Sequence, residues 1–289
     1  MHDIVIVGAG PAGLSAAITA RARNKDALII SNSPKDSPLA KASQIDNYPG
    51  LPKTSGLNLL EALVEQARSL GAAFYFGRVI SILPMGESLS ITTSDEVFEA
   101  RSVILATGTQ SLKPFAGEAE FLGRGVSYCA TCDGMFYRSG TVCVVGLNSE
   151  AVAEANFLNE IGARVFYLAK ELPKGLSERI AVREGSVVEV KGDMMGVTEL
   201  IYKSRETGAE EAIPCNGVFI LRPSIAPDAL LAGLELKDGY IAVDEHGRTN
   251  IPGVFAAGDC TGKPLQIAKA VGEGQLACFS AVGFLDKAL

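Results

Sequence analysis

The chain has 289 residues, of which 47% are hydrophobic, 20% are charged and 31 are glycines, a composition typical of an α/β protein with room for two domains. Its net charge of −7 argues against a nucleic-acid surface, because phosphate binding needs clustered Lys and Arg. The apolar N-terminus lacks a basic region and is interrupted by Gly8, Gly10 and Pro11, which argues against a signal peptide. No apolar run approaches the roughly 20 residues of a membrane span, so we expect a cytoplasmic protein without membrane contact.

The first part of the chain alternates strands and helices. A buried strand at Asp3–Val7, a helix at Pro11–Arg23 and a strand at Ala27–Ile30 predict a βαβ unit. The stretch 33–52 is rich in Pro, Ser and Asp and reads as a long irregular segment. Further elements are expected as a helix at Leu57–Leu70 and as strands at Ala73–Phe76, Val79–Leu83, Leu89–Thr93 and Val103–Ala106.

A second α/β unit follows, and the end of the chain repeats the order strand, glycine-containing turn and helix found at its beginning. The second unit is predicted from a strand at Val142–Val145, a helix at Ser149–Ile161, and strands at Arg164–Leu168 and Phe219–Leu221. A strand at Val254–Ala257, then Gly258-Asp259, leads into a C-terminal helix from about Leu265. We therefore predict an α/β fold of two dinucleotide-binding-type (Rossmann-like) domains, with 113–242 inserted into a discontinuous domain made of 1–112 and 243–289.

The first strand-to-helix turn carries a dinucleotide fingerprint, G-A-G-P-A-G at residues 8–13. Gly8 makes the turn, Gly10 lets a pyrophosphate approach the backbone, and Gly13 lets the helix pack on the strand. Backbone N–H groups and the helix dipole hold the anion. The next strand ends in Ser31 and Asn32 rather than the usual acid, so a hydroxyl or an amide would bind the ribose.

Two of the six cysteines form the sequence Cys129-Ala130-Thr131-Cys132-Asp133. A zinc site is the less favoured interpretation, because a second CxxC and paired histidines are missing and only His2 and His246 occur. Thiols at this spacing can close a disulfide, and a helix start lowers a thiol pKa. The adjacent Asp133 is a candidate proton carrier. Core packing is the alternative, and it is our interpretation of the scattered thiols Cys143, Cys215, Cys260 and Cys278.

The second strand-to-helix turn, V-V-G-L-N-S-E-A at 144–151, keeps the architecture of the first and loses its phosphate chemistry. Only Gly146 is in register, while Asn148 and Ala151 occupy the other glycine places. Asn148 places a side chain where a pyrophosphate would lie, and Glu150 repels an incoming phosphate. We therefore expect this turn not to bind NADPH effectively.

Six motifs together resemble the low-molecular-weight thioredoxin reductases over nearly the whole chain. They are G-A-G-P-A-G at 8–13, I-D-N-Y-P-G at 45–50, A-T-G at 106–108, C-A-T-C-D-G at 129–134, A-G-D at 257–259 and Q-I-A at 266–268. The resemblance implies that the discontinuous domain binds FAD, and that Cys129 and Cys132 form the redox-active disulfide with Asp133 as the acid. It also implies a thioredoxin or thioredoxin-like partner and a homodimer. The FAD contacts that it implies are Gly8, Gly10, Pro11, Ala12, Gly13, Ser31, Gln44, Asn47, Val79, Ala106, Thr107, Gly108, Gly258, Asp259, Gln266, Ile267 and Ala268.

The departures from the family pattern fall mainly in the inserted domain. Besides the broken second turn, the family's His-Arg-Arg reads Ala169-Lys170-Glu171, and Leu265 replaces the Arg before the glutamine. This pattern resembles the ferredoxin-dependent flavin thioredoxin reductases. The resemblance implies an enzyme that passes electrons from a donor such as reduced ferredoxin through FAD to the disulfide and on to thioredoxin. The alternatives are an NADPH-dependent thioredoxin reductase with an atypical coenzyme site and a redox-sensing flavoprotein without turnover.

Overall fold

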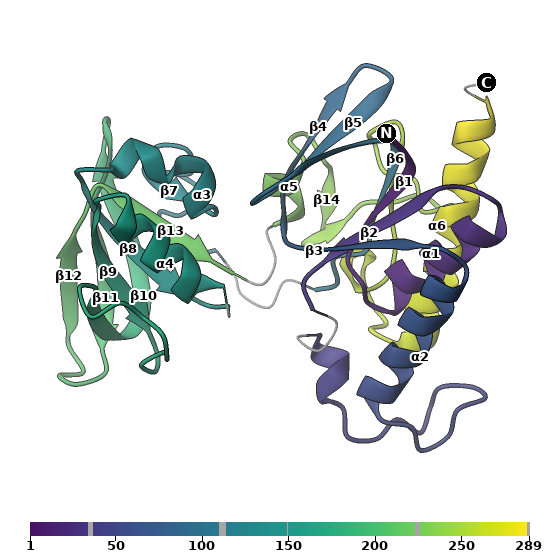
Figure 1. The fold of residues 1–289 in the computed structure, drawn as a ribbon, viewed down its shortest axis with the longest axis horizontal. Coiled ribbons are helices and arrows are strands. Elements are labelled where there is room, and N and C mark those ends of the chain that lie inside the picture. Colours follow the sequence, from purple (N-terminus) through teal and green to yellow (C-terminus); the bar gives the residue numbers. More distant parts are fainter. Residues whose placement is uncertain (34–36, 110–113, 149, 223–225, 288–289) are drawn as a thin grey trace. The chain divides into compact units, whose positions relative to one another are not determined.

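The computed structural model describes residues 1–33, 37–109, 114–148, 150–222 and 226–287, which fold as two units (Figure 1). The first unit comprises Met1–Gln110 with Ser224–Leu289, and the second comprises Ser111–Pro223. The chain therefore returns to the first unit near residue 223, earlier than the expected 242. The reason is local packing, since the short helix α5 (Pro227–Leu230) contacts β4 (Val79–Met85) of the first unit. None of the described helices is long and apolar enough to cross a membrane.

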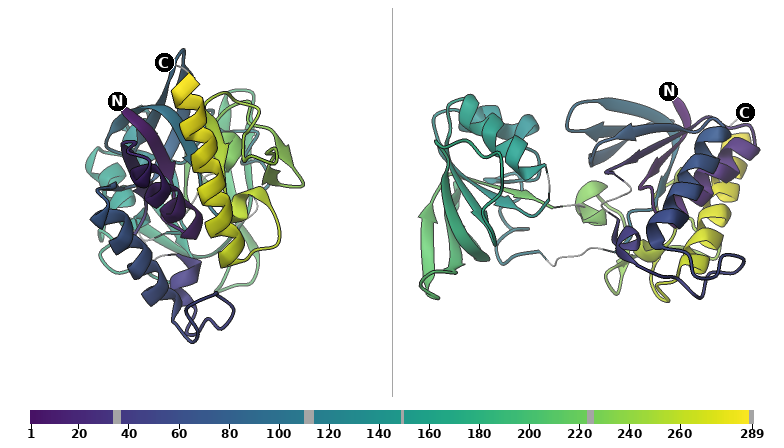
Figure 2. Two further views of the ribbon diagram at one scale, coloured as in Figure 1. Left: turned by 90° about the vertical axis from the view of Figure 1, so that its right-hand side faces the viewer. Right: turned by 60° about the horizontal axis from the view of Figure 1, so that its bottom comes forward.

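A seven-stranded sheet forms the first unit. Four parallel strands have the order β3-β2-β1-β6, with β16 also parallel to β6, and an antiparallel meander β6-β5-β4 continues the sheet. Helices α1, α2 and α6 form a layer against the parallel part (Figures 1 and 2). The remaining elements of this unit are β1 (His2–Val7), α1 (Pro11–Ala22), β2 (Ala27–Ser31), η2 (Pro38–Lys41), α2 (Gly56–Ser69), β3 (Ala73–Phe76), β5 (Ser88–Thr93), β6 (Val97–Leu105), β14 (Leu236–Lys237), β15 (Tyr240–Ile241), β16 (Val254–Ala256), η4 (Asp259–Thr261) and α6 (Ile267–Lys287).

Local sequence explains where the first helices begin and end. The α1 helix starts with Pro11 in its first turn, where the missing N–H of proline costs nothing, and it ends just before Asn24, whose φ is +57°. The α2 helix is capped by the Ser55 hydroxyl, which accepts the backbone N–H of Asn58 at 3.2 Å. It ends before Gly71, whose φ is +87°.

The second unit is also built on a seven-stranded sheet, in the order β12-β11-β10-β9-β8-β13-β7. The strands from β10 to β7 are parallel, whereas β10, β11 and β12 are antiparallel. One face of the sheet packs on α3 and α4, and the other carries a separate core around Phe121 and Leu200. The elements are β7 (Val126–Ser127), α3 (Ala130–Asp133), η3 (Gly134–Tyr137), β8 (Thr141–Gly146), α4 (Ala151–Glu160), β9 (Arg164–Ala169), β10 (Ala181–Asp193), β11 (Gly196–Ser204), β12 (Glu210–Pro214) and β13 (Gly217–Leu221).

The two parallel regions bear out the predicted α/β class with two Rossmann-like folds. Among its described residues, the irregular segment predicted at 33–52 contains one short 3-10 helix, η2. The C-terminal helix, expected from about Leu265, begins at Ile267.

Candidate active site

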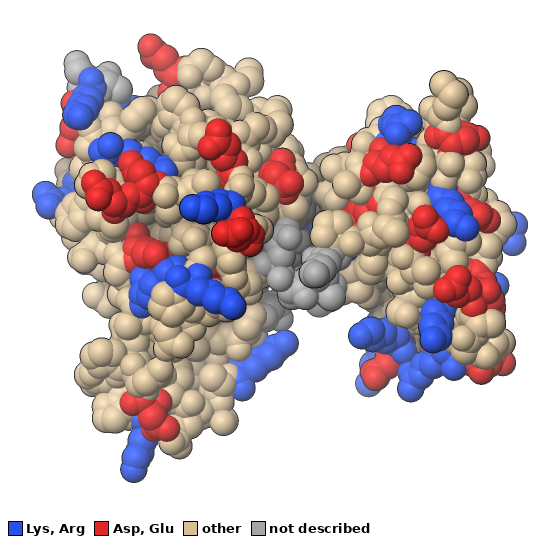
Figure 3. Space-filling view, turned by 180° about the vertical axis from the view of Figure 1, so that it is seen from behind, with Lys and Arg blue, Asp and Glu red and all other residues tan. Residues whose placement is uncertain are grey.

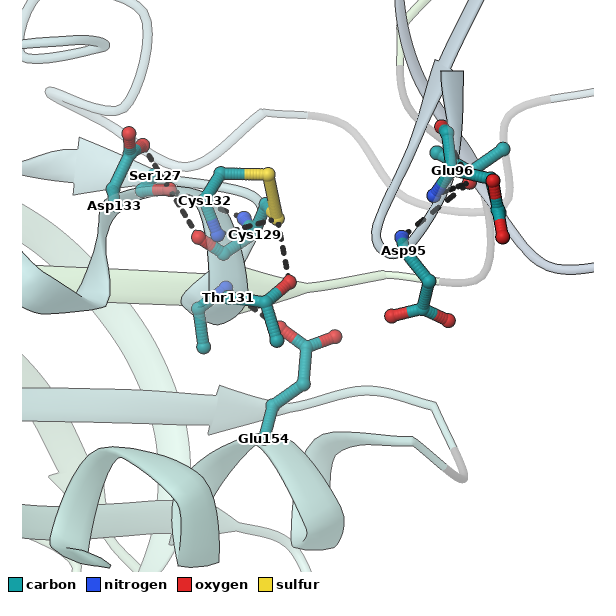
Figure 4. Close-up of a disulfide and its surroundings, with 10 residues drawn as sticks. Asp95, Glu96, Ser127, Cys129, Thr131, Cys132, Asp133 and Glu154 are labelled. Atoms are coloured by element: carbon teal, nitrogen blue, oxygen red, sulfur yellow. Dashed lines mark hydrogen bonds between the residues drawn. A yellow bond between two sulfur atoms is a disulfide. The ribbon is translucent and has the colours of Figure 1, made fainter. Parts of the chain in front are cut away.

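The predicted cysteine pair forms a disulfide in the second unit (Figure 4). Cys129 follows β7 and Cys132 lies in α3, with their Cα atoms 5.4 Å apart. Cys129 is buried, whereas Cys132 is exposed. The backbone N–H of Cys132 donates to Sγ of Cys129 at 3.1 Å, as a helix-capping contact does. The two sulfurs therefore differ in access to a partner molecule.

Ser127 connects the predicted acid to the disulfide turn. Its hydroxyl donates to Oδ2 of Asp133 at 2.7 Å and accepts the backbone N–H of Cys129 at 3.1 Å. Figure 4 shows the Asp133 carboxylate at Ser127, pointing away from the two sulfurs. The Tyr137 hydroxyl responds to the same environment, since burial, and then the charge of Asp133, raises the pKa of Tyr137. The role of Asp133 as the acid stays a prediction.

The three glycines of the first turn have the geometry that a bound pyrophosphate requires. A Cβ on Gly8, whose φ is +112°, would lie 2.3 Å from the carbonyl oxygen of Ala106. A Cβ on Gly13 would lie 1.9 Å from the carbonyl oxygen of Gly8. A Cβ on Gly10 would meet nothing within 4 Å, and no side chain caps α1 there. The α1 N-terminus is thus open toward the place of an anion.

Strand register brings most of the other predicted cofactor residues to one edge of the first sheet. Val7 pairs with both Ile30 and Leu105, and Leu105 pairs with Ala256, so these strands end side by side. The predicted residues that follow or flank those strand ends are Gly8, Gly10, Pro11, Ala12, Gly13, Ser31, Ala106, Thr107, Gly108, Gly258 and Asp259. In an open parallel sheet, ligands bind beyond the carboxyl ends of the strands.

The predicted residues outside these strand ends fall into two groups. Asn47 donates to Oε1 of Gln266 at 2.9 Å, which joins the segment before α2 to the start of α6, where Ile267 and Ala268 follow. Gln44 instead donates its amide to the Asp46 carboxylate at 2.8 Å, and Val79 is buried at the start of β4. The roles of Gln44 and Val79 as FAD contacts stay predictions.

A lysine and a glutamate that the sequence analysis missed hold the loop of Gly258 and Asp259. Nζ of Lys269 donates to the carbonyl oxygens of Gly258 at 2.9 Å and Gly262 at 2.7 Å, and pairs with Glu273 at 3.0 Å. Oε2 of Glu273 accepts the backbone N–H of Gly258 at 2.9 Å. Burial raises the pKa of Asp259; Lys269 lowers it in part and Glu273 adds to the rise. The i, i+4 spacing of Lys269 and Glu273 on the last helix was the available signal.

The second strand-to-helix turn is closed by its own side chain. Oδ1 of Asn148 accepts the backbone N–H of Ala151 at 2.9 Å, and Nδ2 donates to the carbonyl oxygen of Arg222 at 3.2 Å. Beside the turn, a Cβ on Gly146 would lie 2.0 Å from the Tyr167 hydroxyl, so the buried tyrosine fills this space. The Asn148 amide therefore occupies the helix start that in the first turn is left to a ligand.

A buried ion pair lies beyond the neighbouring strand of the same unit. Arg222, directly after β13, forms a two-pronged contact with Glu118, with Nη2 2.7 Å from Oε2. The Tyr128 hydroxyl donates to Oε1 of Glu118 at 2.9 Å, and the backbone N–H of Phe115 donates to Oε2 at 2.8 Å. Glu118 is 1% exposed and Arg222 is 8% exposed, so the guanidinium group of Arg222 makes its ionic contact inside the protein.

The chain matches known proteins over nearly its whole length. The family model described as "Pyridine nucleotide-disulphide oxidoreductase" matches residues 2–274. The chain belongs to this family. Within it, the chain is similar to the thioredoxin reductase of Treponema pallidum, with 36% identity over 300 residues that cover 99% of this chain and 97% of the relative.

Solved structures give the same result. A crystal structure of a ferredoxin-flavin thioredoxin reductase from Clostridium acetobutylicum matches with a TM-score of 0.89 and 42% identity, covering 99% of this chain and 98% of that chain. A thioredoxin reductase from Gloeobacter violaceus matches with a TM-score of 0.85 and 34% identity, covering 99% and 95%. The expected thioredoxin reductase family is thereby confirmed, and the chain is a flavin-dependent disulfide oxidoreductase.

Members of this family bind FAD, and the residues of the first unit fit that cofactor. The uncapped α1 N-terminus and the close backbone approaches at Gly8 and Gly13 suit the pyrophosphate. Lys269 and Glu273, here called the Lys269–Glu273 clamp, hold the loop after β16 in which Asp259 lies. We predict that Asp259 binds a hydroxyl group of the cofactor. These individual contacts remain predictions.

Proposed function

We propose that this chain is a thioredoxin reductase whose electron donor is not NADPH but a one-electron carrier of the reduced ferredoxin type. Electrons would pass by way of FAD to the Cys129–Cys132 disulfide and from there to the disulfide of thioredoxin or a thioredoxin-like protein. The chemistry that bound FAD supplies is the conversion of single-electron input into the two-electron reduction that a disulfide needs. One cysteine of the reduced pair then attacks the partner disulfide, and the other resolves the mixed disulfide.

The bond between Asn148 and Ala151 carries the donor proposal. An NADPH-type turn needs a free helix N-terminus for the pyrophosphate, and here Oδ1 of Asn148 accepts that N–H at 2.9 Å. Glu150, directly before α4, adds a negative charge at the same place. Beyond β9, Lys170 is followed by Glu171 where a 2′-phosphate would require a cluster of arginines.

Two further points bear on the donor. Similarity to a protein named as a ferredoxin-flavin thioredoxin reductase, at 42% identity, supports the ferredoxin class. The surface charge gives little support for or against a ferredoxin donor, because on the face in Figure 3 Lys and Arg alternate with Asp and Glu on both units. Docking of an acidic donor would therefore depend on local contacts on this face and not on one broad field.

Anaerobic titration of the oxidised holoenzyme tests the proposal directly. Reduced ferredoxin should bleach the flavin absorbance and support thioredoxin reduction, whereas NADPH at the same electron equivalents should do neither within the same time. Rapid bleaching by NADPH alone would establish the NADPH-dependent alternative. Flavin reduction by ferredoxin without any thioredoxin turnover would instead establish a redox sensor.

Two further expectations accompany the function. A homodimer is predicted, and sedimentation equilibrium should give twice the mass of the chain. The cytoplasm is the predicted location, and fractionation of cells against a cytoplasmic marker checks it.

A further inference from the structure

The position of one buried carboxylate in the second unit is not explained by the disulfide chemistry described so far. Glu154 lies on α4 and is 9% exposed. Its Oε2 accepts the backbone N–H of Ala130, the residue after Cys129, at 2.8 Å. Figure 4 shows the Glu154 side chain extending from α4 to the turn that carries the disulfide. A long-range contact thus ends between the two cysteines.

A carboxylate at this place affects the reduced cysteines in two ways. The carboxylate takes up the N–H of Ala130, which is therefore not available to a thiolate on either cysteine. The negative charge also repels a thiolate, more strongly on the buried Cys129, where screening by water is weak, than on the exposed Cys132. Both effects depend on the negative charge of the carboxylate, which the Glu154→Gln variant removes.

We propose that Glu154 is a positioning residue of the disulfide: it fastens the Cys129–Cys132 turn to α4, and its charge keeps the reduced cysteines protonated. Reduction breaks the Sγ–Sγ bond with two electrons, and two protons complete the thiols at a pH below their pKa. A dithiol whose thiolate is disfavoured is a stronger reductant, since its reduced form gains less from ionisation. The inference rests on the disulfide activity of the proposed function and not on the identity of the donor.

Other ionisable side chains lie on the helices at this turn, and Glu154→Gln leaves all of them unchanged. On α3, η3 and α4, together with the residues that flank them, the described charged or titratable side chains are Asp133, Tyr137, Arg138, Glu150, Glu154 and Glu160. Glu160 is exposed at the far end of α4, so Glu160→Gln removes the same charge from the same helix without touching the turn. It is the matched control.

The test compares Glu154→Gln with the wild-type holoenzyme and with Glu160→Gln. The amide oxygen of glutamine can still accept the Ala130 N–H, so the variant removes the charge while keeping the contact. Alkylation of the dithiothreitol-reduced enzyme by iodoacetamide, followed by mass spectrometry as a function of pH, measures the thiol pKa. We expect Glu154→Gln to lower the pKa of the more reactive thiol by about one unit, and alkylation near pH 6 to be about threefold faster, since nucleophilicity falls together with pKa.

Equilibration with dithiothreitol, which is oxidised to its cyclic disulfide, gives an independent readout. A fall of about one unit in the thiol pKa raises the equilibrium constant for reduction up to about tenfold at a pH well above that pKa, or up to about 29.6 mV. At pH 6 it should be unchanged. A merely structural role would alter stability or turnover without this pH-dependent difference.

Three results would overturn the inference. The first is an alkylation profile for Glu154→Gln that superimposes on those of the wild type and Glu160→Gln. The second is a shift of the same size in Glu160→Gln. The third needs no variant: a wild-type thiol pKa below about 7 means that the carboxylate does not suppress the thiolate. None of these measurements involves ferredoxin or NADPH, so they fail or succeed separately from the donor proposal.

Discussion

The Ser127 hydroxyl donates to the Asp133 carboxylate at 2.7 Å, and the same oxygen accepts the backbone N–H of Cys129 at 3.1 Å. One buried serine thereby fixes both the predicted acid and the first cysteine of the disulfide. The acid is consequently held at a defined place beside the turn, without a direct bond to sulfur in the disulfide state that Figure 4 shows.

This relationship predicts graded losses of turnover. Asp133→Asn should lower kcat for thioredoxin reduction about a hundredfold if the carboxylate carries the proton. Ser127→Ala should lower it about tenfold, because the carboxylate stays but loses its anchor. Steady-state assays with the flavin spectrum as a check on folding measure both. Ser139→Ala, at an exposed serine of the same unit, is the control, and equal activity in all four proteins would remove Asp133 from the chemistry.

The unequal exposure of the two cysteines predicts which one meets the partner. Cys132 is exposed and Cys129 is buried, so Cys132 should form the mixed disulfide with thioredoxin. Cys129→Ser should accumulate a covalent complex with thioredoxin on non-reducing gels, and Cys132→Ser should not. Both variants should keep the yellow flavin and lose thioredoxin reduction. A complex trapped only by Cys132→Ser would reverse the order.

The Lys269–Glu273 clamp predicts a loss of cofactor affinity at a distance. Lys269→Met would leave the carbonyl oxygens of Gly258 and Gly262 without their cation, which loosens the loop that carries Asp259. We expect FAD to bind about tenfold more weakly, equivalent to about 1.4 kcal/mol. The rise of FAD fluorescence on dilution measures the loss. Lys287→Met, at the exposed end of the same helix, should bind FAD as the wild type does.

Asp259 predicts a pH dependence of stability in the FAD-depleted protein. Burial is the main reason that the pKa of Asp259 is raised, so the folded state holds this proton more tightly than the unfolded state does. The contribution of the carboxyl group to stability is therefore largest below its ordinary pKa of about 3.9 and is lost as pH rises through the raised value. Urea unfolding of Asp259→Asn and the wild type should show the variant gaining relative stability over this interval. A constant difference across pH would contradict the assignment.

Asn148 predicts a stability effect that is separate from catalysis. Asn148→Ala removes the acceptor for the Ala151 N–H, and such caps contribute about 1 kcal/mol. Denaturant unfolding should show a loss of that size, while ferredoxin-linked thioredoxin reduction per folded molecule stays unchanged. Asn159→Ala, at the other end of α4, should change stability by less than about 0.5 kcal/mol.

The α/β class and the Cys129–Cys132 disulfide could be predicted from the sequence because their signals are local, and the FAD contacts, predicted from equally local signals, stay predictions. The spacing of Gly8, Gly10 and Gly13 and the pair Cys129–Cys132 each lie within a few residues. The contacts that were missed join residues far apart in the chain, such as Ala130 with Glu154 and Glu118 with Arg222, which are 24 and 104 residues apart. The return of the chain at residue 223 was missed for the same reason, since α5 gives no local sign that it packs on β4.

The bonded network of Glu118 and Arg222 limits how this unit can vary in sequence. Replacing one partner alone breaks a buried ion pair, at a cost of about 3–5 kcal/mol. Positions 118 and 222 can therefore change only together, although 104 residues separate them in the chain.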